Sequence, residues 1–188
     1  MKKKSLLLLV CVLALVFAAC GNADAPAATT GEEMAKELKM GRAQYAAHGN
    51  SGWADVVVAM EGDKIVGVSL DEFQFMNVED ATPVPNSLEE GERALQNNFK
   101  DPKVAPASKR VNSDLYSAMM TEKAKSTVSI AANFDAIEAF CTGKTVAELK
   151  TVVEGEKKDV TDMVTGATLV DTKGYIEAVI AACEAIQE

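Results

Sequence analysis

The chain has 188 residues and a formal net charge of −9, with 28 acidic residues against 19 Lys and Arg. An acidic chain without a basic stripe argues against nucleic acid as a partner and against attraction to anionic lipid headgroups. The cysteines form no CxxC or Cys/His cluster, which leaves zinc, haem c and iron–sulfur sites without ligands. His48 is the single histidine, and no nucleophile elbow lies near it to build a hydrolytic triad. We therefore expect neither a metal site nor a catalytic group.

The N-terminus has the layout of a secretory signal peptide. Residues 2–4 are lysines, residues 5–19 are apolar, and Cys20 follows two alanines, as in a lipobox. Phe17 stands where a branched residue is usual. An uncleaved membrane helix is the alternative, but the apolar stretch is shorter than the roughly 20 residues that span a bilayer. We predict that residues 1–19 are removed and that lipid on Cys20 anchors the protein at the extracytoplasmic face of the membrane.

Cleavage before Cys20 leaves 169 residues (188 minus 19) with a net charge of −12, because three lysines are lost from −9. Residues 21–30 are small and polar and predict a flexible tether. Thr30 and Glu33 form a capping box that predicts a short helix to about Met40. Residues 20–40 thus hold the lipidated cysteine, tether and short helix, and residues 41–188 form the domain.

Two stretches of β-branched residues, 53–61 and 64–73, flank Glu61-Gly62-Asp63 and predict a hairpin. Val56, Val58 and Met60 are expected to share one face of the first strand. Their candidate partners on the second strand are Val66, Val68 and Leu70.

Residues 76–111 are broken by four prolines and predict a functional excursion. Within it, Ser87 and Glu90 predict a capped helix to about Asn98.

The second half of the chain has helical periodicity. Helices are predicted at about 113–123, 127–141, 145–153 and 172–187, and residues 154–159 are predicted to be a solvated connection. The fold class is therefore α+β, in which a small antiparallel sheet with a β-hairpin packs against several helices. Further short strands are expected at positions that the pattern does not locate. Cys141 and Cys183 either form a disulfide, which an exported compartment permits, or are two buried thiols.

Residues 162–168 carry the most informative motif. Asp162, Thr165, Gly166, Ala167 and Thr168 match Asp-x-x-[Ser/Thr]-Gly-Ala-[Thr/Ser] at every fixed position. This resembles the flavinylation motif of the FMN-binding domain family. The family includes the flavin-carrying peripheral subunits of sodium-translocating NADH:quinone reductases and lipoproteins of extracellular electron transfer. The alternative is an ordinary turn before a helix.

The resemblance extends beyond the motif to about residues 41–187. It includes the lipoprotein signal, the hairpin, Ser126 and Thr127, the run 133–137 and the closing helix. Residues 76–111 depart from the shorter family domains. The resemblance implies that a Mg-dependent flavin transferase attaches FMN through its phosphate to Thr168.

The residue chemistry agrees with attachment at Thr168. A threonine hydroxyl is a poor nucleophile without a base, so a separate enzyme is expected to modify it. Gly166 permits a tight turn, and Ala167 keeps the turn small. The helix predicted near Thr172 would offer N–H groups to a phosphate. We interpret Asp162 as a group that the transferase recognises, since its charge would repel phosphate.

Other residues are candidates for contacts with the flavin ring. The alternative for each is an ordinary structural role in the core or on the surface. Ser126 and Thr127 either cap the following helix or bind the phosphate. The remaining candidates are Tyr116, Met119, Met120, Leu169, His48, Trp53 and the segment Asp71-Glu72-Phe73-Gln74-Phe75 that closes the hairpin.

The resemblance implies an electron carrier rather than an enzyme with its own substrate. Covalent FMN would take electrons from a membrane donor and pass them to an extracellular or envelope acceptor. The sequence contains no GxGxxG dinucleotide fingerprint, so direct oxidation of NADH is not expected. Two alternatives stand beside this one, a flavin-dependent reductase of a small extracellular acceptor and a flavin-free binding lipoprotein of the same fold.

Overall fold

The computed structural model describes residues 37–87 and 101–186. The predicted signal peptide, Cys20, the tether and the helix predicted at 88–98 lie outside these residues. Within the described part of the chain, no helix combines the length and the apolar character needed to cross a membrane.

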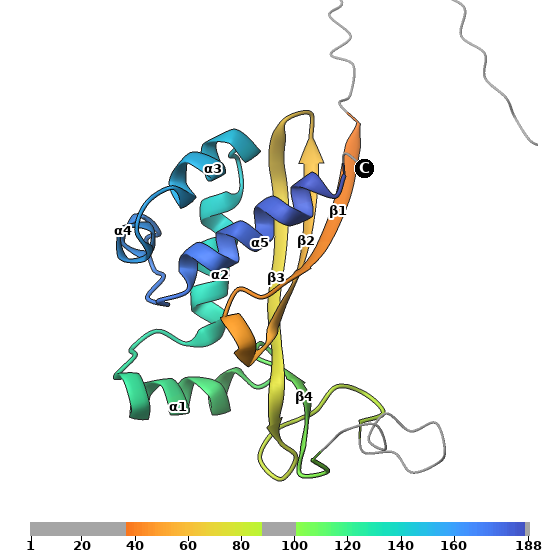
Figure 1. Ribbon diagram of the computed structural model, residues 1–188, viewed down its shortest axis with the longest axis vertical. Coiled ribbons are helices and arrows are strands. Elements are labelled where there is room, and N and C mark those ends of the chain that lie inside the picture. The colour runs from red at the N-terminus through yellow and green to blue at the C-terminus, as the bar shows by residue number, and fades with distance from the viewer. Residues whose placement is uncertain (1–36, 88–100, 187–188) are drawn as a thin grey trace, which may run out of the picture. The chain divides into compact units, whose positions relative to one another are not determined.

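Four antiparallel strands form one sheet in the order β1-β2-β3-β4 (Figure 1). They are β1 (Leu38–Tyr45), β2 (Trp53–Glu61), β3 (Lys64–Asn77) and β4 (Val104–Ser108). The predicted hairpin is confirmed as β2 and β3. The strands that the sequence pattern did not locate are the two at the edges of the sheet.

Strand β1 shows that the predicted helix to Met40 is wrong for its last residues. Leu38 pairs with Glu61, and Met40 pairs with Ala59 in the antiparallel register with β2. The capping-box signal is local, whereas this pairing depends on a strand that begins more than ten residues later. Tertiary pairing therefore overrides the local helix signal in this segment.

The hairpin register agrees with the prediction except at its end. Two predicted pairs are confirmed, Val56 with Leu70 and Val58 with Val68. Met60, however, pairs with Ile65 instead of Val66, because the register shifts between Ala59 and Met60. The bulge turns Ile65 into the core and leaves Val66 44% exposed.

In the described part of the chain, five α-helices accompany the sheet (Figure 1). They are α1 (Ser113–Ala124), α2 (Ile130–Cys141), α3 (Val146–Val153), α4 (Lys157–Met163) and α5 (Thr172–Glu184). Helix α5 packs against β1 and β2, and α2 packs against β3. The α+β class is therefore confirmed.

Two details of the helices differ from the prediction. Helix α2 begins later than expected and is capped by Ser129, whose hydroxyl accepts a hydrogen bond from the Ala132 N–H at 3.1 Å. The expectation that Ser126 or Thr127 caps it is therefore wrong. The predicted solvated connection 154–159 is also wrong at its end, since α4 begins at Lys157.

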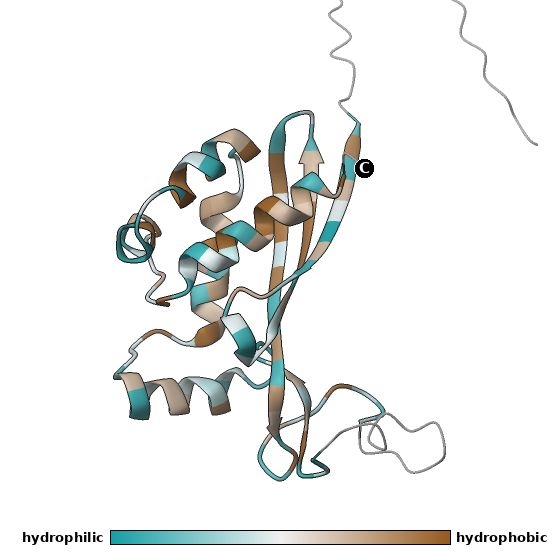
Figure 2. Ribbon diagram, in the orientation of Figure 1, coloured by the Kyte–Doolittle hydropathy of each residue, from teal (hydrophilic) through white to brown (hydrophobic). Residues whose placement is uncertain are grey.

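The main core lies between the sheet and the pair α2 and α5. Its fully buried side chains include Val56, Leu70, Phe134, Ile137 and Ile176. Figure 2 shows hydrophobic residues alternating with hydrophilic ones along the strands, as expected for a sheet with one covered face.

The buried cysteines belong to this core. Cys141 and Cys183 are free thiols, so the disulfide alternative is not formed. Burial raises the pKa of Cys141 to about 12 and that of Cys183 to about 11.

Candidate functional site

A cavity of about 420 Å³ lies beside the segment that carries the motif threonine. This volume is within the range of small-molecule sites, roughly 300–1,000 Å³. The structure brings together at its wall seven of the residues that sequence reasoning singled out. They are His48, Tyr116, Met120, Ser126, Thr127, Thr168 and Leu169.

Thr168 follows a tight turn after α4. Gly166 has a positive φ of 93°, which favours glycine, and the Ala167 N–H donates to the Val164 carbonyl at 3.0 Å. The turn delivers Thr168 to the cavity wall with its side chain exposed. Thr168 can thus be reached both from the cavity and from solvent, and its hydroxyl donates to Asn133.

Asn133 of α2 fixes the backbone of Thr168. Its side-chain oxygen accepts the Thr168 N–H at 2.6 Å and lies 3.3 Å from the Thr168 hydroxyl. Its amide nitrogen donates to the carbonyls of Val128 and Ser129 at 3.3 and 2.9 Å. Because both amide hydrogens are used there, the oxygen is directed at Thr168. Sequence reasoning noted residue 133 only as part of a family-like run, and missed this role.

The rest of the motif lies beside the cavity rather than in its wall. Asp162 is exposed in the last turn of α4, and Thr165 and Gly166 are exposed in the turn. Ala167 is half-buried and packs against the core. These residues present a surface next to Thr168, and they do not border the space that a ligand would fill.

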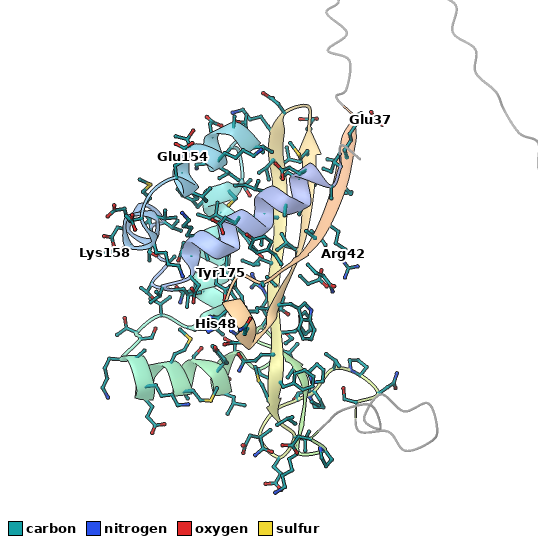
Figure 3. The ribbon with its side chains drawn as sticks, viewed as in Figure 1. Glu37, Arg42, His48, Glu154, Lys158 and Tyr175 are labelled. Carbon is teal, nitrogen blue, oxygen red and sulfur yellow. The ribbon has the colours of Figure 1, made fainter. Side chains whose placement is uncertain are left out.

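Asp171 sits at the N-cap of α5 and carries two ion pairs. Its carboxylate lies 3.0 Å from Nδ1 of His48 and 3.1 Å from Nζ of Lys157. The helix terminus proposed for phosphate thus already has an anion beside it, balanced by Lys157 and by His48 when it is protonated. Figure 3 shows the labelled His48 and Tyr175 near the start of α5.

Hydrogen bonds from two helices hold the segment between Thr168 and α5. The hydroxyls of Thr161 and Thr172 both donate to the Leu169 carbonyl, at 3.0 and 2.7 Å. Gly174 lets α5 approach the loop that follows β1 closely, since a Cβ there would lie 2.4 Å from the Ala47 carbonyl oxygen. This side of the cavity is therefore a fixed wall.

A buried charged cluster lies at another side of the cavity. Lys109 is 1% exposed, and its ammonium donates to Oε2 of Glu72, which is fully buried. The Tyr175 hydroxyl donates to the same oxygen at 2.7 Å. The Lys109 nitrogen also lies 4.4 Å from the centroid of the Tyr116 ring. Burial, followed by the charge of Glu72, raises the pKa of Tyr175 well above its ordinary value.

Sequence reasoning did not identify Lys109 or Tyr175 as site residues, and it named Glu72 only as part of the segment 71–75 that could border the flavin. One signal for Glu72 was present, because the two-residue period of β3 places it on the same face as the buried Leu70. A charged residue on a core face requires a buried partner. The sequence does not say which residue provides it.

Four predicted flavin neighbours do not reach this cavity. Trp53 and Phe73 stack on each other, with ring centroids 5.6 Å apart, and Phe73 lines a separate cavity of about 330 Å³. Phe75 is 50% exposed on β3. Met119 is half-buried on α1, whereas its neighbour Met120 lines the wall. These four are therefore not neighbours of Thr168 across the cavity.

Comparisons with protein-family models, with curated proteins and with solved structures find no match to this chain. Across residues 37–87 and 101–186, no group of His, Cys, Asp and Glu is arranged to hold a metal ion. The assignment of a function therefore depends on the motif and on the geometry around Thr168.

Proposed function

We propose that the protein is a lipid-anchored electron carrier that holds FMN covalently, through its phosphate, on Thr168. The observation that carries the proposal is the accessible Thr168 hydroxyl on the wall of a cavity of ligand size. The motif supplies the identity of the group, since Thr168 is the residue that the resemblance marks for flavinylation. Cys20 would supply the anchor.

The residues around the cavity suit a flat ring that is mostly apolar with polar edges. Tyr116, Met120, Ile130 and Leu169 offer apolar surface along the wall. Thr127 and the ammonium of Lys109 offer hydrogen-bond donors at its edges. A phosphate ester on the Thr168 oxygen would replace the 3.3 Å hydrogen bond that the hydroxyl donates to Asn133, but it would leave the 2.6 Å bond from the Thr168 N–H intact.

FMN supplies one- and two-electron transfer when it is bound, and the protein supplies position, access and local charge. Asn133 holds the attachment residue, while the apolar wall limits water around the ring. Val170, which is 73% exposed, lies on the open side of the cavity. A membrane donor and an envelope acceptor would approach the ring edge from this side.

The test is the mass of the peptide that contains Thr168 after co-expression with a flavin transferase. The expected result is a gain equal to FMN minus water in the wild-type protein. Thr168→Ala should abolish the gain, whereas Thr151→Ala, a change at an exposed threonine of α3 that does not line the cavity, should keep it. An unmodified peptide in wild-type protein that circular dichroism shows to be folded would refute the proposal.

A further inference from the structure

Lys109 is a buried cation that borders the cavity. It directly follows β4, and its N–H donates to the Glu72 carbonyl at 2.8 Å, which fixes its backbone against β3. Its side chain is 1% exposed but still contributes to the cavity wall. The contact with the Tyr116 ring further restricts the ammonium. These contacts hold the Lys109 ammonium in a fixed position relative to a ligand in the cavity.

The charges of this cluster are arranged asymmetrically. Lys109 and Tyr175 line the cavity, and both donate to Oε2 of Glu72, which is not part of the wall. The positive end of the ion pair therefore lies nearer to the cavity than the negative end. Because water is excluded from the pair, its field is screened less than that of an exposed lysine.

We propose that Lys109 makes this cavity bind the reduced form of a flavin ring more tightly than the oxidised form. The inference rests on the proposed function, which puts the ring there. Two electrons and one proton, taken from a donor, leave the reduced ring with one additional negative charge. The ammonium of Lys109 favours that charge, and its ion pair with Glu72 holds the side chain in place.

We expect Lys109 to change the ratio of the affinities for reduced and oxidised flavin at least tenfold. For a two-electron couple, tenfold corresponds to about 30 mV in the reduction potential. Lys125, an exposed lysine at the rim of the same cavity, should have less than a twofold effect, because water screens its charge.

The test compares the double variant Glu72→Gln/Lys109→Met with Lys125→Met. Replacing both partners avoids leaving a buried carboxylate unpaired, which alone can prevent folding. The glutamine still offers an oxygen to the Tyr175 hydroxyl. The potential of the flavin-loaded proteins is measured by spectroscopic titration with dithionite.

A potential at least about 30 mV lower in the double variant, with little change in Lys125→Met, is the expected result. An unchanged potential in the double variant overturns the role of Lys109. If the Thr168 peptide carries no flavin, the proposed function fails separately. Free oxidised and dithionite-reduced FMN are then titrated onto the same proteins. A tenfold change in the affinity ratio supports the inference, and an unchanged ratio or no binding overturns it.

Discussion

Replacing Asn133 tests whether the fixed backbone of Thr168 matters for its modification. Asn133 is fully buried and joins α2 to the motif through bonds of 2.6 Å to the Thr168 N–H and 2.9 Å to the Ser129 carbonyl. Two longer contacts of 3.3 Å reach Val128 and the Thr168 hydroxyl. At about 1 kcal/mol for each short bond and less for the others, Asn133→Ala should lower the free energy of unfolding by about 2–4 kcal/mol. It should also lower the fraction of flavinylated protein.

The chain provides a matched control in Asn112. Its side chain is also buried and bonds to the backbone, accepting from the Thr82 N–H at 2.7 Å and donating to the carbonyls of Thr82 and Ser108, both at 2.9 Å. Asn112→Ala should cause a similar loss in urea denaturation but leave flavinylation intact. Equal flavinylation of the two variants, measured by mass spectrometry on folded protein, would refute the role assigned to Asn133.

Three further predictions concern the fold. Phe134→Ala should cost about 3–5 kcal/mol in urea denaturation, because the ring is fully buried. Gly41→Val should cost about 1–3 kcal/mol by the same measurement, since a Cβ at Gly41 would lie 2.0 Å from the Ala182 carbonyl oxygen. The Thr145 N–H, followed by its hydroxyl, lowers the pKa of Glu148 below its ordinary 4.5. That stabilisation is present above pH 4.5 and is lost as the pH falls through the lowered value, so Glu148→Gln should flatten the pH dependence of stability there.

The parts of the fold that the sequence predicts are those with strong local patterns. The hairpin has a clear turn and two alternating stretches, and the capping box of Thr145 and Glu148 is present as expected. The edge strands were missed for different reasons. A capping box obscured β1, and Pro106 obscured β4, although a proline is compatible with an edge strand.

The sequence predicts the site residues that lie in or next to the short motif. It does not predict the buried polar residues, because their role depends on hydrogen-bond partners far away in the chain. Thr168 ends the motif and Leu169 follows it directly, and Tyr116 is predicted because an aromatic side chain on a neighbouring helix suits the wall of a flavin site. Asn133 and Lys109 are polar residues whose burial depends on partners that are 35 and 37 positions away in the chain. A single sequence does not pair such residues.

The surroundings of Asp171 change how a phosphate on Thr168 should be pictured. The sequence predicts that the first turn of α5 attracts it, but the N-cap residue there is Asp171, whose carboxylate is itself an anion, although it makes no capping hydrogen bond. A phosphate there would face like charge unless it lay away from Asp171, and the ion pair of Asp171 with Lys157 reduces that repulsion. The exposed Thr168 side chain leaves room for the phosphate on the solvent side. The attachment site is therefore better explained by access and by the hold of Asn133 than by attraction to a helix terminus.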